Sequence, residues 1–172
     1  MPHGVKAKVG DIFQIPVDES RVGYGQIVAD IRPNPLLLAV YEPLFPRRQA
    51  APLQEIVRAP ILFLANSLDS KIWHEQWPVV GRIPPSLDRI PFPAFKTTME
   101  KAEDYYVVSY DGSRRRRATP EEIDRLDFRT TVAPQRLENA LKAQYGLIPW
   151  EAGFERLRYD YVRSRSDSTV NW

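Results

Sequence analysis

The sequence predicts an α+β fold: a bent, mainly antiparallel β-sheet or a small, partly open barrel, with helices in the C-terminal half. Three observations predict it. Strand-like runs bounded by turn residues fill the chain up to about residue 118, and the helix-capping patterns come after that point. Proline makes up 16 of the 172 residues, well above its usual share, and most of it lies before residue 94. Long helices are therefore not expected in that region, since an interior proline breaks a helix.

The first elements expected are two strands around a polar turn, over residues 9–17 and 22–31. In the second strand Ile27, Ala29 and Ile31 alternate with residues that face the other side, which is the period of a half-buried strand. We expect this pair to begin an antiparallel meander.

Three further strands are predicted in the first half of the chain. Residues 36–42 and 56–66 are apolar, β-branched or aromatic runs bounded by proline, and their lengths favour buried strands over helices. Residues 77–81 form a shorter run in which Pro78 lacks a backbone donor. We therefore place this run at a sheet edge or at the start of a strand.

A hairpin and a short helix are expected next. Asp111 and Gly112 separate the strand-like runs 105–110 and 114–118, and Asp-Gly between such runs is a strong hairpin signal. Residues 119–122 read Thr-Pro-Glu-Glu, which places an N-cap hydroxyl, a proline at the first helical position and a glutamate at the third. This capping box predicts a helix through about residue 127.

A second helix is predicted from Pro134 to the stop signal at Gly146. Its apolar stripe, which we expect to dock on the sheet, consists of Leu137, Ala140, Leu141 and Tyr145. The whole chain, residues 1–172, is predicted to be a single domain with a core over about residues 8–146. Residues 147–172 form a C-terminal extension that we expect to be partly loosely ordered, because its last stretch has little apolar periodicity.

Composition excludes several classes of function. The chain has no cysteine, so disulfides, thiolate nucleophiles and Cys-ligated metals are excluded. Its apolar runs are too short to span a membrane, and no secretory signal is visible, so a cytoplasmic location is expected.

Searching for enzyme motifs gives no catalytic, metal-binding or cofactor-binding candidate. His3 and His74 cannot build a histidine-rich metal site, and the sequence has neither a phosphate loop nor a Gly-x-Ser-x-Gly elbow. Carboxylate chemistry by Asp11 or Glu75 with Asp69 stays open, but we favour surface solvation for these residues.

Arginines 114–117 form the most unusual charged segment. Clustered guanidiniums neutralise phosphates, but alternate residues of a strand face opposite sides, so only about two would face each way. A solvated or acid-paired hairpin arm is favoured over an acidic protein partner, and nucleic acid comes last. From exposed charge alone, the candidate partner-binding residues are Asp18, Glu19, Arg114, Arg115, Arg116, Arg117, Glu121 and Glu122.

Six segments carry a resemblance to a known family. Residues 10–16, 23–28 and 77–84 read GDIFQIP, GYGQIV and WPVVGRIP, and residues 110–112, 121–126 and 134–141 follow in matching order. Over most of residues 8–146 the chain resembles the immunity protein 26 family. This resemblance implies an immunity protein of a bacterial polymorphic toxin system that binds and neutralises a cognate toxin. Its motif residues, which we interpret as structural, are Gly10, Asp11, Gly25, Trp77 and Gly81.

The same family grouping also carries the name of a small phosphotriesterase, so hydrolysis of phosphotriesters is the alternative function. Familiar phosphotriesterases use metal-activated water held by several histidines, which this chain lacks. The binding function is therefore favoured. The residues identify neither the toxin nor the oligomeric state.

Overall fold

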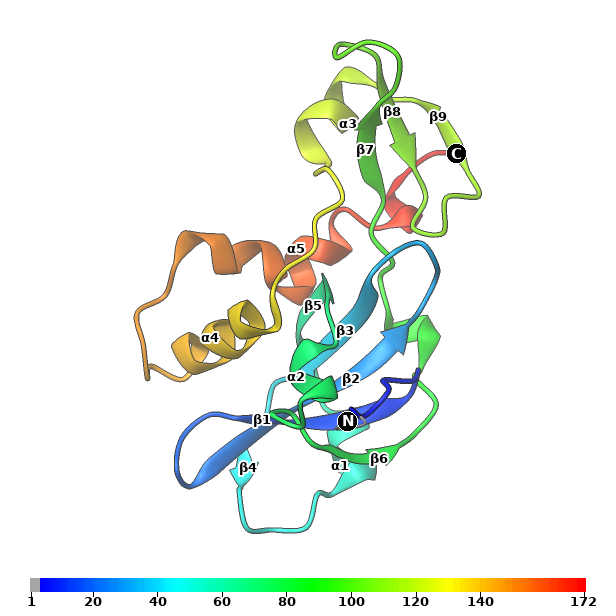
Figure 1. Ribbon diagram of the computed structural model, residues 1–172. Helices are drawn as coiled ribbons and strands as arrows, with labels where there is room; N and C mark the ends of the chain where they lie inside the picture. The colour runs from blue at the N-terminus through cyan, green and yellow to red at the C-terminus, as the bar shows by residue number, and fades with distance from the viewer. Residues whose placement is uncertain (1–3) are drawn as a thin grey trace. The chain divides into compact units, whose positions relative to one another are not determined.

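The computed structural model describes residues 4–172 as an α+β protein with two antiparallel sheets, neither of which closes into a barrel (Figure 1). The predicted fold class is therefore confirmed, in its open-sheet form. The chain divides into two compact units. Unit 1 runs up to Leu87 and again over Thr131–Tyr159, and unit 2 comprises Asp88–Thr130 and Asp160–Trp172. The single-domain organisation stays a prediction.

Unit 1 is built on a six-stranded antiparallel sheet in the order β5-β3-β2-β1-β6, with β4 paired to the start of β2. The first hairpin and the third predicted strand are confirmed, and so is the edge position of the strand after Pro78. The elements of this unit are β1 (Asp11–Pro16), β2 (Arg21–Ala29), β3 (Leu36–Tyr41), β4 (Phe45–Pro46), α1 (Leu53–Arg58), β5 (Ile61–Ser67), α2 (Ser70–Trp73), β6 (Val79–Arg82) and α4 (Pro134–Gln144).

Helix α1 replaces the first part of one predicted strand. The sequence predicts a strand over residues 56–66, but the strand begins only at Ile61, and residues 56–58 form the end of helix α1. Ile56 is fully buried in a cluster with side chains of β1, β2 and β3, so one helical turn suffices to bury it. A short apolar run without alternating polar residues fits a buried helix as well as a buried strand, so the spacing of its apolar residues does not distinguish the two structures.

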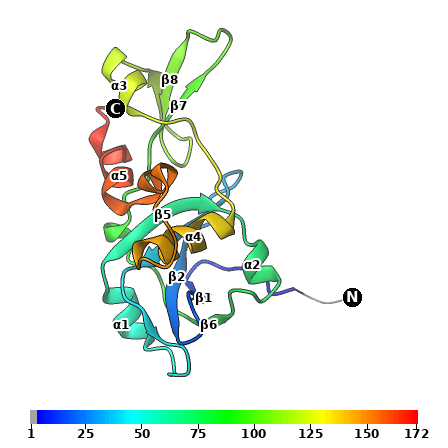
Figure 2. The same cartoon turned by 90° about the vertical axis from the view of Figure 1, so that its left-hand side faces the viewer.

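The core of unit 1 lies between the sheet and α4. Helix α4 lies beside the strands of this sheet (Figure 2). Its Leu137, Ala140 and Leu141, all fully buried, pack with side chains of β1, β2, β3 and β5. The second predicted helix and its docking stripe are thus confirmed. Phe154 and Leu157, from the 3₁₀ segment after α4, are buried in the same cluster, so the C-terminal extension contributes to this core.

Unit 2 contains a three-stranded antiparallel sheet in the order β7-β8-β9. The predicted hairpin is confirmed as β8 and β9. The elements of this unit are β7 (Phe95–Thr98), β8 (Tyr105–Val108), β9 (Arg115–Arg117), α3 (Pro120–Arg125) and the 3₁₀ segment Asp167–Thr169. The 3₁₀ segment Ala152–Leu157 belongs to unit 1, while the 3₁₀ segment Leu87–Arg89 and helix α5 (Tyr159–Arg163) span the boundaries between the units.

The predicted capping box opens α3. The Thr119 hydroxyl accepts a hydrogen bond from the Glu122 N–H, and the Glu122 carboxylate accepts one from the Thr119 N–H. A small apolar cluster of unit 2 consists of Ala94, Val107, Leu126 and Val170, with Trp172 packed against it. Within residues 4–172 no helix has the length and apolar character that crossing a membrane requires.

Candidate partner-binding surface

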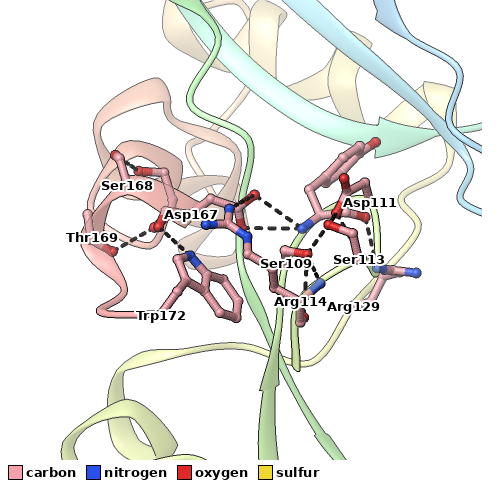
Figure 3. Close-up of polar contacts among 11 residues, drawn as sticks. Ser109, Asp111, Ser113, Arg114, Arg129, Asp167, Ser168, Thr169 and Trp172 are labelled. Carbon is pink, nitrogen blue, oxygen red and sulfur yellow. Dashed lines mark hydrogen bonds and ion pairs between the residues drawn. The ribbon is translucent and has the colours of Figure 1, made fainter. Parts of the chain in front are cut away.

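The arginine run lies in unit 2, where strand β9 turns alternate side chains to opposite faces of the sheet. Arg114 and Arg116 face Trp172, whose ring centre lies 4.4 and 6.0 Å from their respective guanidinium carbons. Figure 3 shows Arg114 beside this ring. These two arginines are therefore engaged in contacts within unit 2.

Arg115 and Arg117 lie on the other face. Arg117 lies over the ring of Tyr106, its cross-strand neighbour, with 5.5 Å to the ring centre. Its Nη1 is 3.2 Å from a carboxylate oxygen of Asp104, in an exposed pair that contributes little to stability. Arg115 is exposed, and its side chain forms no ion pair with any residue in the described part of the chain, residues 4–172. The run presents two guanidiniums on each face, as strand geometry predicts.

Arg116 is held by Glu122 in a two-point ion pair. Its Nη1 and Nη2 donate to the two carboxylate oxygens at 2.9 and 2.7 Å, and its Nε donates to the Asn171 carbonyl at 2.8 Å. The Arg116 hydrogen bonds lower the pKa of Glu122 to about 2, although burial acts to raise it. Glu122 is buried, so the prediction of an exposed charge is wrong there, whereas Glu121 beside it is exposed.

Asp111 organises the turn between β8 and β9 (Figure 3). Its carboxylate accepts hydrogen bonds from the Ser113 hydroxyl at 2.7 Å, the Ser113 N–H at 2.9 Å and the Ser109 hydroxyl at 2.7 Å. These bonds, those from Ser113 first, lower the pKa of Asp111 to about 2. The turn fixes where β9 begins and therefore which arginine faces which side.

Asp167 has the opposite shift. Burial disfavours its ionised form and raises its pKa to about 6. The Tyr110 N–H, which donates to Asp167 at 3.2 Å, and the Arg114 guanidinium, 3.8 Å away, oppose this shift, while the charge of Asp111 adds to it. An ionised Asp167 therefore costs folding free energy at neutral pH.

Replacing Asp167 by asparagine is expected to stabilise the protein above about pH 6 and to leave its stability unchanged below about pH 4. The folded carboxyl group, with a pKa of about 6, holds its proton more tightly than the unfolded one at 3.8, so ionisation destabilises the fold as the pH rises through this range. The gain at high pH should be about 1 to 3 kcal/mol. Urea unfolding of both proteins at the two ends of the range measures it, and an equal difference at both ends would contradict the assignment.

Asp18 and Glu19 lie in unit 1, in the turn between β1 and β2. The Asp18 carboxylate accepts hydrogen bonds from the Arg21 Nε at 2.8 Å, the Ser20 N–H at 2.9 Å and the Arg21 N–H at 2.7 Å. The Arg21 side chain is the largest cause of a pKa lowered to about 2. Asp18 thus closes the turn, while Glu19 is exposed.

The described residues hold no group of three or more His, Cys, Asp or Glu side chains placed to bind a metal ion. His74 is exposed at the end of α2, and His3 lies outside the described residues. Asp69 and Asp30 both line a hollow in unit 1, where Arg32 pairs with Asp30 at 3.0 Å.

Compared with known families, residues 8–106 match immunity protein 26, a stretch that covers more than half of the chain. This chain belongs to the immunity protein 26 family. Searches among curated proteins and among solved structures find no match. The family match ends within β8, so the arginine run lies beyond it.

Two of the glycines that we interpret as structural motif residues occupy positions where the backbone or its close neighbours require glycine. Gly10 has a φ of +92°, in the region that strains other residues. A Cβ at Gly25 would lie 2.4 Å from the Phe13 ring and 2.9 Å from the Ala39 carbonyl oxygen, so a side chain does not fit between these strands. Gly81 lies half-buried in the edge strand β6.

Asp11, for which surface solvation is expected from the sequence, is instead buried, with 2% of its surface exposed. Its carboxylate accepts hydrogen bonds from the Arg82 Nε at 2.7 Å and from the Lys8 N–H at 2.9 Å. The expectation is wrong because Arg82 is 71 residues away along the chain, and only the pairing of β1 with β6 brings it opposite Asp11.

Trp77, the predicted core anchor of the family motif, is buried and stacks on Phe13 with 5.2 Å between ring centres. Its Nε1 donates to a carboxylate oxygen of Glu138 at 3.0 Å. Glu138, in α4, also accepts hydrogen bonds from Lys71 at 2.5 Å and from Lys142 at 2.9 Å. This buried network is not predicted from the sequence. Its one local signal is the four-residue spacing of Glu138 and Lys142, which places the two side chains next to each other on a helix.

Proposed function

We propose that this protein is a bacterial immunity protein that neutralises a cognate toxin of a polymorphic toxin system by forming a stoichiometric complex with it in the cytoplasm. The match of residues 8–106 to the immunity protein 26 family carries the proposal. Immunity by binding requires a surface that is complementary to the toxin in shape and charge, rather than a set of catalytic groups.

The charged residues that the fold leaves exposed are proposed to contact the toxin. Arginine and tyrosine are enriched in protein interfaces, and Arg117 lies over Tyr106 on the face of the unit 2 sheet from which Arg115 also projects. Glu121 in unit 2 and Glu19 in unit 1 are proposed as further contacts. The other candidates are proposed to hold the turns and strands in place: Asp18, Arg114, Arg116 and Glu122.

Co-expression with a candidate toxin, sought in the gene next to the one that encodes this protein, tests the proposal. Cells are expected to survive induction of the toxin only when this protein is also made, and the two purified proteins should elute together at a one-to-one ratio. The dissociation constant should be nanomolar or tighter, which corresponds to about 12 kcal/mol of binding free energy.

Two results would contradict the proposal. One is a failure to protect cells combined with no complex at micromolar concentrations. The other is turnover of a chromogenic phosphotriester that disappears in a His74→Ala variant, because that result would favour the hydrolase alternative. An active-site variant of the toxin, which is harmless to cells, serves as the control for binding without toxicity.

A further inference from the structure

Strand β9 forms the sheet edge that combines exposed charge with a free backbone. The edge of β5 is closed by isolated bridges from Val132 and Arg158, and that of β7 by a bridge from Phe128. At β6 the single charged side chain, Arg82, is held by Asp11. Within residues 4–172 no bridge reaches the outer edge of β9.

The register between β8 and β9 determines which backbone groups point outward. The Ser109 N–H donates to the Arg114 carbonyl at 3.0 Å, which makes these two residues a hydrogen-bonded pair. Every second residue from Arg114 on therefore turns its backbone toward β8, and the intervening Arg115 and Arg117 turn theirs outward. The Arg117 carbonyl accepts a bond from the Arg116 guanidinium at 2.9 Å. Across the described chain, the N–H and C=O of Arg115 and the N–H of Arg117 are left without a partner.

The side chains of the same two residues supply positive charge along this edge. In an added strand, directly opposite side chains lie about 4.5 to 5.5 Å apart, so carboxylates at alternate positions would face Arg115 and Arg117. The pair between Arg117 and Asp104 does not prevent this, since 69% and 30% of these side chains are exposed. The alternating donors and acceptors of the edge match another peptide strand and not a phosphate backbone, so they favour protein over nucleic acid.

We propose that the outer edge of β9 binds an extended, acidic segment of the toxin as a fourth strand of the unit 2 sheet. This inference rests on the proposed function, because it names the part of the toxin that the immunity protein recognises. Backbone hydrogen bonds would hold the segment, and its alternate carboxylates, paired with Arg115 and Arg117, would give specificity.

A pair of variants separates the backbone contribution from the charge. Arg115→Pro removes the outward N–H without removing a hydrogen bond to β8, because proline is tolerated where an edge N–H faces solvent. Arg115→Ala removes the same charge and keeps the N–H. The dissociation constant of the toxin complex is expected to be at least about fivefold higher for Arg115→Pro than for Arg115→Ala.

A second pair tests the charge itself. The double variant Arg115→Glu with Arg117→Glu is expected to weaken toxin binding by at least about tenfold. The matched control, Lys101→Glu with Arg163→Glu, makes the same change in charge at exposed residues of unit 2 outside β9 and should stay within about twofold of the wild type. Circular dichroism and urea midpoints verify that each variant folds.

A short labelled peptide of alternating glutamate and valine provides a probe that does not need the toxin. It is expected to bind the wild type in fluorescence anisotropy, and its copy with N-methyl groups on alternate residues is expected not to bind. Equal binding of both peptides, no binding at millimolar concentration, or equal binding of an oligonucleotide of the same charge would overturn the proposal.

The toxin assay distinguishes the failure of this inference from a failure of the proposed function. If the wild type protects cells and both Arg115 variants bind the toxin equally, the edge proposal is overturned and the immunity function stands. If the wild type does not bind the toxin, the immunity function fails, and the two peptides still decide whether the edge accepts an acidic strand.

Discussion

Replacing Glu138 by alanine is expected to lower the free energy of unfolding by about 3 to 5 kcal/mol, because it leaves a largely buried ammonium group and a buried indole N–H without this acceptor. The Lys71 side chain is only 14% exposed, and its Nζ donates to Glu138. The Trp77 indole N–H donates to the same carboxylate oxygen at 3.0 Å. The indole N–H is cut off from water when the carboxylate is removed, since Trp77 is 1% exposed, whereas the Lys71 ammonium group keeps only limited access to solvent.

Two controls define the Glu138 prediction. Lys142→Ala removes the most exposed partner of the carboxylate, with 28% of its side chain accessible, and should cost less than about 1 kcal/mol. Glu138→Gln keeps an acceptor for Trp77 but removes the charge opposite Lys71, so its effect should fall between the two. Urea unfolding at neutral pH measures all three, and a Glu138→Ala effect no larger than that of Lys142→Ala would contradict the role of the network.

The pH dependence of the same group has a definite sign. Burial raises the pKa of Glu138, but the hydrogen bonds from Lys71, Lys142 and Trp77 together outweigh it and leave the pKa below its ordinary value of 4.5. A carboxylate with a lowered pKa stabilises the fold above its unfolded value and loses this contribution as the pH falls through the folded value. The penalty of Glu138→Gln should therefore shrink in acid.

Leu141→Ala is expected to lower the free energy of unfolding by about 2 to 4 kcal/mol, because truncation of a fully buried leucine leaves a cavity in the core of unit 1. Leu141 packs so closely on β2 that a Cβ at Gly23 would lie 2.5 Å from its Cδ2. The matched control is Leu147→Ala, since Leu147 is 41% exposed and should change stability by less than about 1 kcal/mol. Equal urea midpoints for Leu141→Ala and the wild type would show that α4 does not dock as described.

The elements that the sequence predicts are those with a local signal. The strand around Ile27, the capping box at Thr119 and the apolar stripe of α4 each have a signal that lies within a few residues, and all three elements are confirmed. The half-buried character that the alternation predicts is wrong, because every residue of β2 from Val22 to Ala29 is buried. Helix α1 has no such signal, because its short apolar run fits both states. Asp11 and Glu138 are missed for another reason: their partners come from distant parts of the chain, and only the folded sheet brings them together.

The candidate surface was predictable in part. Strand geometry alone predicts that the four arginines divide two by two, and the contacts with Trp172 and Tyr106 agree. The four arginines alone do not predict which two face Trp172, because this depends on the turn that Asp111 closes and on the position of Trp172. Glu122 belongs to a charged segment of the sequence, but its carboxylate accepts a hydrogen bond from the Thr119 N–H in the capping box. The same carboxylate is paired with the Arg116 guanidinium, so it is not exposed.

The interleaved course of the chain sets the order in which the protein assembles during synthesis. The six strands of the larger sheet have all been made by Leu87, but the helix that covers their apolar face begins at Pro134. With roughly 50 residues between them, translation at about 5 to 20 residues per second leaves that face bare for about 3 to 10 seconds. The smaller sheet likewise waits for Val170 before its core is complete. Each nascent chain therefore passes through a stage in which apolar strands are accessible to chaperones and to neighbouring chains.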